Sequence, residues 1–285
     1  MIRRLALTVA AGLALALSAC GAPAAPTDAG AGGGAAAAGA ELRLPPGDAA
    51  PDYQLGGSAE PDPAVTLVAR DRTAAPDPDR YSICYVNGFQ TQPGELDAWP
   101  AETLLRDPAG EPVIDPAWPD EILLDTGTAA QRAQIAAVVT PWITGCADAG
   151  FDAVEFDNLD SYTRSDGALS LPDNLALATD LVAAAHGVGL AAGQKNAVED
   201  AATLRAQAGF DFAVTETCAA YRECGGYRAV YGERVIDIEY TDLLPRTFAE
   251  MCADADSPAA MVLRDRALAT PDDPGYVFEL CGSRD

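Results

Sequence analysis

Short apolar runs recur along the chain, and most of them are followed by an alanine-rich segment of helical length. Eight runs rich in β-branched or aromatic residues predict strands, at residues 53–55, 65–68, 82–86, 153–156, 190–194, 212–215, 235–239 and 260–263. This alternation is typical of repeated βα units that build a parallel sheet. We therefore expect an α/β fold, a (β/α)8 TIM barrel in a single domain.

Apolar residues at mixed three- and four-residue spacing predict helices at residues 129–149 and 175–186. Pro141 is expected to kink or split the first helix, because proline lacks the amide hydrogen that the helix needs. Asp173 or Asn174 is expected to cap the second helix.

A ninth apolar run, at residues 121–124, does not fit a count of eight strands. It follows residues 99–119, which are rich in proline and tryptophan and read as a long loop. We therefore place this run in an insertion after the third predicted strand.

The first 20 residues have the layout of a secretory signal. Arg3 and Arg4 precede an apolar run at residues 5–17, and the small residues before Cys20 resemble a bacterial lipobox. The run is too short for a permanent membrane span. We expect a lipid on Cys20 that anchors the chain to the bacterial membrane, with an ordinary cleaved signal as the alternative. Both place the protein outside the cytoplasm.

This layout divides the chain into three regions. Residues 1–20 form the signal peptide with its lipobox. Residues 21–48 begin with a stretch that is nearly all Ala, Gly and Pro, which predicts a flexible linker. Residues 49–285 form the barrel domain, which is long enough for one barrel and short for two enzymes.

The charge is strongly acidic, with 43 acidic against 18 basic residues and a formal net charge of −25. Nucleic acid is excluded as an expected partner, because phosphate binding needs basic patches. An anionic surface attracts a cationic polymer, although acidity also simply keeps an exported protein soluble.

Six cysteines follow Cys20, an even number that predicts disulfides in an oxidising compartment. Cys218 and Cys224 are close enough for a local bridge, and Cys252–Cys281 and Cys84–Cys146 are the weaker pairings among the fifteen connectivities that six cysteines allow. A zinc site is disfavoured, because His186 is the only histidine and no C-x-x-C pattern occurs. We expect no metal and no cofactor.

Polar residues end four consecutive predicted strands, and in a barrel the carboxyl ends of the strands form the active site. The ends read Glu155-Phe156-Asp157-Asn158, Gln194-Lys195-Asn196, Thr215-Glu216-Thr217 and Glu239-Tyr240-Thr241-Asp242. A single histidine argues against Ser-His-Asp and Cys-His catalysis and multi-histidine zinc sites. What remains is carboxylate chemistry, and glycoside hydrolysis needs two carboxyl groups and no cofactor.

These segments resemble glycoside hydrolase family 114, endo-α-1,4-polygalactosaminidases with a barrel fold. The segments that carry the resemblance are residues 53–57, 83–86, 118–125, 154–162, 185–190, 193–196, 215–218 with Tyr221 and Cys224, and 238–240. The order and spacing of these segments extend over nearly the whole barrel domain. Phe156 and Gln194 depart from the family pattern, and because both are assigned to the sugar site, the natural sugar is left open.

The resemblance implies that Asp157 is the nucleophile and Glu216 the acid/base. Lys195, the only lysine, stands one strand over, where its charge would keep Asp157 ionised. Glu216 must be protonated at rest to donate to the leaving oxygen, which calls for a less charged, partly buried pocket. The remaining expected substrate binders or supports are Glu155, Asn158, Asp160, Tyr162, Asn196, Glu239, Tyr240, Asp125 and Tyr85. Glu155 is alternatively expected to face the barrel interior.

Aromatic residues near the strand ends are expected either to stack on sugar rings or to pack in the core. They are Tyr85, Phe89, Trp99, Trp118 and Tyr162.

The sequence therefore predicts an exported, monomeric glycoside hydrolase that cleaves an α-linked, galactosamine-containing polysaccharide by a retaining mechanism. Three alternatives stay open. One is a non-catalytic carbohydrate-binding lipoprotein, the second is a glycosidase of the same mechanism that acts on another α-glycan, and the third is a purely structural envelope lipoprotein.

The lipobox gives the first testable prediction. Cys20→Ala should release the protein from the membrane fraction without loss of fold, because the linker after Cys20 carries no core. Fractionation after high-salt washing, with circular dichroism of the released protein, measures both effects. Retention of Cys20→Ala in the washed membranes would contradict the lipid anchor.

Overall fold

The computed structural model describes residues 41–282 of the chain. The signal segment with Cys20, and residues 21–40 of the expected linker, lie outside the described residues. Residues 41–48, which the sequence assigned to the linker, lie against the barrel. Leu44 packs on the barrel's interior cluster, and Arg43 forms a 2.7 Å ion pair with Asp152.

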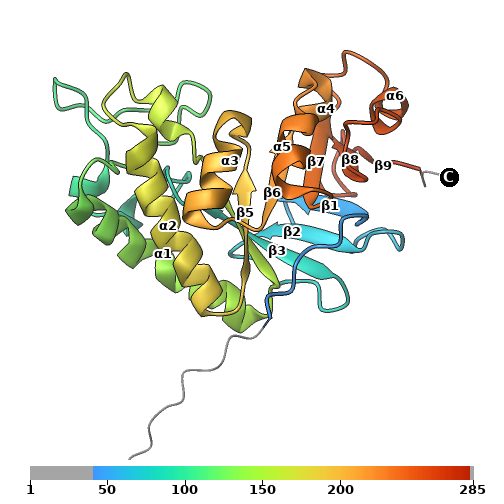
Figure 1. The fold of residues 1–285 in the computed structure, drawn as a ribbon, viewed down its shortest axis with the longest axis horizontal. Helices are drawn as coiled ribbons and strands as arrows, with labels where there is room; N and C mark the ends of the chain where they lie inside the picture. Colours follow the sequence, from blue (N-terminus) through green and yellow to red (C-terminus); the bar gives the residue numbers. More distant parts are fainter. Residues whose placement is uncertain (1–40, 283–285) are drawn as a thin grey trace, which may run out of the picture. The chain divides into compact units, whose positions relative to one another are not determined.

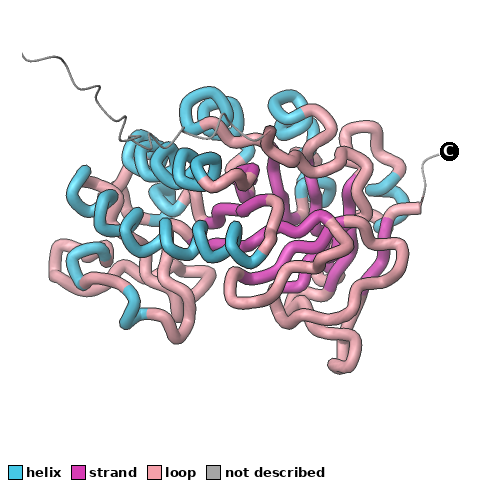
Figure 2. Tube along the Cα trace, turned by 90° about the horizontal axis from the view of Figure 1, so that it is seen from below, coloured by secondary structure: helices cyan, strands magenta, loops and turns pink. Residues whose placement is uncertain are grey.

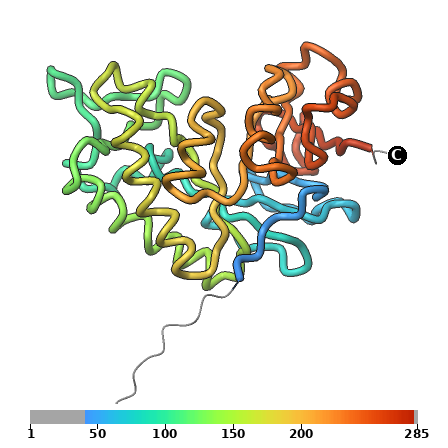
Figure 3. The backbone as a smooth tube through the Cα atoms, in the orientation of Figure 1, coloured from blue at the N-terminus to red at the C-terminus, as the bar shows by residue number. Residues whose placement is uncertain are grey.

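The described residues form a nine-stranded sheet whose strands follow the order of the sequence, so the architecture is α/β and TIM-barrel-like (Figures 1 and 3). Parallel ladders join β1 to β8, and β9 pairs with β8 in the antiparallel direction. The strands are β1 (Pro51–Gln54), β2 (Leu67–Asp71), β3 (Tyr81–Asn87), β4 (Ala153–Asp157), β5 (Ala191–Lys195), β6 (Phe212–Glu216), β7 (Val235–Tyr240), β8 (Ala260–Arg264) and β9 (Phe278–Leu280).

The eight predicted strands are confirmed, with bounds that differ by a few residues. β9 was not predicted, because three residues near the chain end carry too little pattern to distinguish a strand from a loop. Residues 121–124 lie in the expected insertion between β3 and the first helix. There they form isolated antiparallel bridges, such as Gln90 with Leu123, and add no strand to the barrel.

Helices cover the barrel unevenly. The helices of more than one turn are α1 (Ala129–Ala149), α2 (Leu171–Gly187), α5 (Cys224–Tyr231) and α6 (Phe248–Cys252), and shorter turns include α3 (Ala201–Thr203), the π-helical η5 (Leu204–Ala208), α4 (Cys218–Tyr221) and the 3-10 turns η1 (Leu96–Ala98), η2 (Ala101–Thr103), η3 (Ser161–Arg164) and η4 (Val198–Asp200). The connections from β1 to β2 and from β2 to β3 are loops without a helix (Figure 2). The first third of the wall therefore departs from a regular βα repeat.

The helix is not split at Pro141, which lies inside the continuous α1. The carbonyl that proline leaves without a partner is that of Ala137, four residues earlier, and both residues are exposed, so water can satisfy it. Ser170 caps α2 in place of Asp173 or Asn174, and the Asp173 carboxylate accepts from the Ser170 amide to complete a capping box.

Alternation along each strand separates two apolar layers. Inward residues such as Ile83, Val214 and Ile238 fill the barrel, while outward residues such as Val154 pack against the helices. Gly193 lies on the inward face of β5, where an added Cβ would stand 2.5 Å from the Phe212 ring. A glycine at this position therefore lets a phenylalanine fill the interior.

The seam between β1 and β8 is closed by a side chain. Within residues 41–282 no ladder joins these two strands, although they lie side by side. Arg264, at the end of β8, forms a 2.6 Å ion pair with Asp52 on β1 and also donates to the Tyr53 carbonyl. Both charged side chains are almost fully buried, at 2% and 4% exposure. Each buried charge is therefore compensated by the other, because both have little access to water.

Three disulfides confirm the expected pairings Cys84–Cys146, Cys218–Cys224 and Cys252–Cys281. The first ties β3 to α1, and the last ties α6 to the segment after β9. Such bonds persist in oxidising compartments, which indicates that the protein works outside the cytoplasm. In the described part of the chain, none of the helices has the length and apolarity that crossing a membrane requires.

The seam generates a stability prediction. Asp52→Asn should lower the free energy of unfolding by about 3 kcal/mol or more, because it leaves the Arg264 guanidinium buried without an opposite charge. Denaturant titration measures this loss. Asp242→Asn is the matched control, since it removes the exposed partner of Arg266 and should change stability little. Equal effects of the two substitutions would contradict the role of the seam pair.

Candidate active site

The carboxyl ends of β4, β5 and β6 direct three charged side chains into one cavity. Asp157, Lys195 and Glu216 are inward positions, because each alternates with the apolar residues that fill the barrel below. They line a cavity of about 830 Å³. The expected residues Asn158, Asp160, Asn196, Tyr85 and Tyr240 line the same cavity.

The backbone turns sharply directly after each of these strands. Asn158, Asn196 and Thr217 follow the three charged residues, and their φ values are 62°, 49° and 62°. Asparagine tolerates this left-handed conformation, whereas a β-branched threonine is strained in it. Such strain is typical of functional sites, where the surrounding contacts hold the backbone in place.

The Lys195 ammonium group is the centre of the site and is 2% exposed. Its nitrogen lies 3.2 Å from Glu155, 3.5 Å from Asp157 and 3.3 Å from Glu216, and it donates to the Tyr53 hydroxyl at 2.9 Å. Burial alone would lower the pKa of Lys195, but the surrounding carboxylates raise it well above its ordinary value. Lys195 is therefore a fixed positive charge at neutral pH.

Glu216 is held by three donors. Tyr240 donates its hydroxyl to Oε1 at 2.5 Å, and Asn196 donates its side-chain amide to Oε2 at 3.2 Å, beside Lys195. Burial raises the pKa of Glu216, but the Lys195 charge and these hydrogen bonds outweigh it and keep the pKa below its ordinary value. The expectation of a weakly charged pocket that keeps Glu216 protonated was therefore wrong.

Asp157 lies on the other side of the ammonium group. Tyr85 donates its hydroxyl to Oδ2 at 2.8 Å, and the Asn158 backbone amide donates to Oδ1 at 2.7 Å. Its side chain is 18% exposed and opens to the cavity. An ionised carboxylate held in this way can attack an electrophilic carbon or stabilise a positive charge.

Glu155 lies beneath the cavity and does not line it. It is fully buried, and the Tyr53 hydroxyl donates to its Oε1 at 2.7 Å. Burial raises the pKa of Glu155 to about 7, although Lys195 opposes the shift. Glu155 therefore faces the barrel interior, the alternative left open by the sequence, and supports Lys195 from below.

The insertion after β3 supplies one wall of the cavity. Asp115, Trp118 and Glu121 reach the cavity from this segment. Arg164 ties the insertion to the β4 loop, because it pairs with Asp115 at 2.6 Å and with Asp160 at 2.9 Å. It also donates to the Asn158 side chain at 3.0 Å, next to Asp157.

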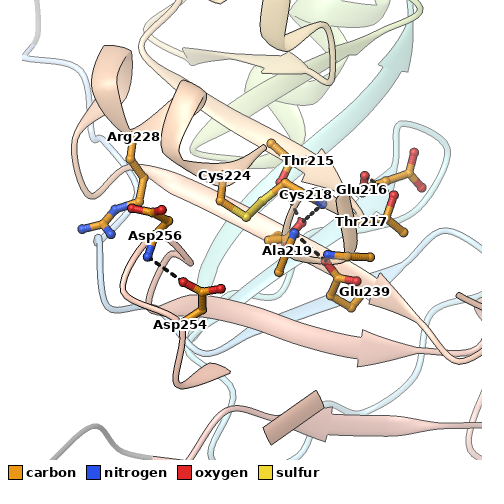
Figure 4. The surroundings of a disulfide bond; sticks show 12 residues. Thr215, Glu216, Thr217, Cys218, Ala219, Cys224, Arg228, Glu239, Asp254 and Asp256 are labelled. Carbon is orange, nitrogen blue, oxygen red and sulfur yellow. Dashed lines mark hydrogen bonds between the residues drawn. A yellow bond between two sulfur atoms is a disulfide. The ribbon is translucent and has the colours of Figure 1, made fainter. Parts of the chain in front are cut away.

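Three of the expected site residues have other partners. The fully buried Glu239 accepts from the Ala219 and Ala220 amides, beside the Cys218–Cys224 disulfide (Figure 4). Tyr162 donates to Asp200 at 2.8 Å, and Asp125 accepts from Gln131. These side chains support the loops that frame the cavity and do not line it.

Among the candidate aromatics, Phe89 and Trp99 are buried in the core, whereas Trp118 is 58% exposed at the cavity. Phe156 and Gln194 were expected to line the sugar site, and this was wrong. Both face the helices and are fully buried, with Phe156 against Phe210 and Gln194 accepting from the Tyr231 hydroxyl. Their departure from the family pattern therefore does not change the walls of the cavity.

Sequence reasoning missed several residues of the cavity. Tyr53, Asp115, Glu121, Arg164 and Arg266 line it. Tyr53 occupies an inward position of the first strand, so strand alternation would have identified it. The insertion residues follow no strand end, and only their tertiary bridges bring them to the cavity.

A buried carboxyl pair supports the loop after Glu216. Asp237 accepts from the Thr215 hydroxyl and the Cys218 amide, while Asp237 Oδ2 and Glu239 Oε2 lie buried and accept from no N–H or O–H group of residues 41–282. Burial and the Glu239 charge raise the pKa of Asp237 well above its ordinary value. One proton held between the two carboxyls satisfies both oxygens. Asp237 and the sulfurs of Cys218 and Cys224 lie close enough together to hold a metal ion, but both sulfurs are bonded to each other in the disulfide.

The fold and the site together define the class of protein, a glycoside hydrolase with a TIM-like barrel and paired carboxylates at its mouth. The family model of glycoside-hydrolase family GH114 matches residues 33–284. The chain belongs to this family.

Solved structures share the fold. Ega3 of Aspergillus fumigatus, solved in complex with galactosamine, matches with a TM-score of 0.68 and 21% identity over 86% of this chain and 100% of that chain. The glycoside hydrolase domain of PelA from Pseudomonas aeruginosa matches with a TM-score of 0.55 and 15% identity over 77% and 95%. No curated protein matches the sequence at a significant level.

The buried carboxyl pair generates a prediction on pH dependence. The folded chain keeps a proton that the unfolded chain releases above a pH of about 4, so this pair makes the fold less stable as the pH rises towards the folded pKa. Asp237→Asn should remove this loss, because the asparagine amide donates to Glu239 without titrating. The advantage of the variant should grow by up to about 1.4 kcal/mol per pH unit.

Denaturant titration between pH 5 and 9 measures this slope. The control is Asp79→Asn, which removes an exposed carboxylate and should leave the slope unchanged. An Asp237→Asn curve parallel to that of the wild type would show that the pair does not hold a proton.

Proposed function

We propose that the protein is an exported hydrolase of an α-linked, galactosamine-containing polysaccharide. It cleaves bonds in the interior of the polysaccharide by a retaining mechanism. Asp157 is the nucleophile and Glu216 the acid/base. The observation that carries this proposal is the shared ammonium group, because Lys195 contacts a carboxylate oxygen of each residue within 3.5 Å.

The shared contact limits the separation of the two carboxylates. Two oxygens that each lie within 3.5 Å of one nitrogen are no more than about 7 Å apart. A retaining pair needs about 5–5.5 Å, whereas an inverting pair needs about 6.5–9.5 Å to admit a water molecule. The shared contact is compatible with the retaining spacing, which this proposal adopts.

Substrate binding supplies the protonation state that Glu216 needs. A sugar that fills the cavity excludes water, and burial already raises the pKa of Glu216 against the influence of Lys195. Glu216 then donates a proton to the leaving oxygen while Asp157 attacks the anomeric carbon. In the second step a water molecule attacks the anomeric carbon while Glu216 takes a proton from that water, and the bond between the sugar and Asp157 breaks.

The charge of the protein supports a cationic substrate. Galactosamine polymers with free amines are cationic, and the chain has a formal net charge of −25. Ega3, which shares the fold, was solved with galactosamine. A neutral α-glycan is the second candidate, favoured by the exposed Trp118 ring, which can stack on a sugar whatever its charge.

We infer that the protein reaches its substrate at the cell envelope, held by a lipid on Cys20 or released there. The three disulfides support this location. A monomer suffices for the proposed reaction, since the two proposed catalytic carboxylates lie in one chain.

The catalytic assignment generates a prediction on activity. Asp157→Asn should lower kcat on galactosamine oligomers by at least about 10³-fold. Glu216→Gln should lower it by about 10²–10⁴-fold, and by less on substrates whose leaving group needs no proton. Thermal unfolding should change little, because both side chains open to the cavity.

Turnover of defined galactosamine oligomers and of an activated aryl glycoside measures these effects. Asp148→Asn, an exposed position of α1, is the charge-matched control and should keep full activity. Full activity in Asp157→Asn would remove the assignment, and cleavage of only neutral α-glucan or α-galactan oligomers would favour the second candidate.

A further inference from the structure

Glu121 is a cavity carboxylate without a matching charge. Four of the other five acidic residues that line the cavity have cations: Asp157 and Glu216 contact Lys195, and Asp115 and Asp160 contact Arg164. Among residues 41–282, no ammonium or guanidinium nitrogen lies within 4.0 Å of Glu121. Its Oε2 accepts from the Asn87 side chain at 3.2 Å, and its Oε1 has no donor within the described chain.

Asp71 is the other cavity carboxylate without an ion pair, but its oxygens are occupied. Oδ1 accepts from the amide and hydroxyl of Thr73, and Oδ2 accepts from Gln92. Glu121 therefore differs from the rest of the acidic lining, because it alone combines an oxygen without a donor with the absence of an ion pair in the described chain.

The position of Glu121 is fixed by the insertion. Its backbone amide donates to the Trp118 carbonyl, and the Trp118 amide donates to the Asp115 carbonyl. Asp115 is itself buried and anchored by Gln90 and Arg164. A rigid turn thus presents the exposed indole ring of Trp118 and the Glu121 carboxylate to the same cavity.

We propose that Glu121 selects sugars that carry a free ammonium group, by pairing with that group while Trp118 supports the sugar ring. An aromatic face binds the apolar side of a pyranose of any charge, whereas a carboxylate binds an ammonium group more strongly than a neutral hydroxyl or amide N–H. This inference rests on the proposed function, since it assigns the choice between free and acetylated amino sugars to one residue of the same cavity.

The surroundings of Glu121 make the pairing depend on pH. The groups that act on it are Asn87 on β3, Asp157 on β4, Asp115 on the insertion, and Arg164. Burial, and next the Asp157 charge, raise the pKa of Glu121 to about 7. An ammonium group stabilises the ionised form, so binding near pH 6 should release a proton from Glu121.

Calorimetry tests the inference with two probes, an α-1,4-linked galactosamine pentamer and the same pentamer after N-acetylation. The Glu216→Gln background keeps both from being consumed. Adding Glu121→Gln should weaken binding of the free-amine pentamer about tenfold or more. Binding of the acetylated pentamer should change by less than about twofold. The proton released near pH 6, seen in buffers of different ionisation enthalpy, should disappear.

Two further variants separate charge selection from general effects. Glu111→Gln removes an exposed carboxylate of the same insertion outside the cavity and should change neither affinity. Trp118→Ala should weaken both pentamers equally. Equal losses for both pentamers in Glu121→Gln, an equal effect of Glu111→Gln, or no binding of either pentamer would overturn the inference.

The outcome is distinct from that of the proposed function. Glu121-dependent binding by a wild-type enzyme that cleaves neither pentamer would refute the hydrolysis and leave the inference standing. If the enzyme cleaves the free-amine pentamer and Glu121→Gln changes neither cleavage nor binding, the proposed hydrolysis stands and the inference on Glu121 is refuted.

Discussion

Oxygen atoms from β1, β4 and β6 surround the Lys195 ammonium group at the mouth of the barrel. A buried cation with a raised pKa permits three carboxyl groups to approach one another, which their mutual repulsion would otherwise prevent. Because this is the only lysine of the chain, no neighbouring lysine can replace it. Arginine would place a planar fork where a compact charge fits.

The rest of the fold serves this cluster at two levels. Below it, small and apolar inward residues fill the barrel, and Gly193, two residues before Lys195 on β5, makes room for Phe212 on β6. Around it, Arg264 closes the seam beside Tyr53, whose hydroxyl contacts Lys195. A buried ion pair between Arg264 and Asp52 thus holds β1 and β8 together where no backbone ladder joins them.

Regular alternation made the barrel and the strand-end charges predictable. Asp157, Lys195 and Glu216 each end a predicted parallel strand, so the sequence pattern alone predicts that they lie at the same edge of the sheet. Glu239 misled because it follows the same kind of run, yet it faces outward and holds the turn at Ala219. A position at a strand end predicts which edge of the sheet a residue lies at. Whether its side chain points into the barrel or outward depends on the alternation along the strand.

The insertion and the chain end escaped prediction for another reason. Glu121 and Trp118 reach the cavity through single antiparallel bridges, which leave no periodic pattern in the sequence. The pKa of Glu216 depends on a lysine one strand away and on a tyrosine 24 residues later, and such sums of contacts require coordinates.

The short disulfide between Cys218 and Cys224 begins two residues after Glu216. The strained Thr217 directly precedes the loop that this disulfide closes, and the Cys218 amide at the start of the loop donates to the buried Asp237. Oxidation of these two thiols therefore fastens the turn that follows Glu216. In a reducing compartment the same turn would lack this bond, so the conformation of the cavity edge at Glu216 depends on the redox state of the surroundings.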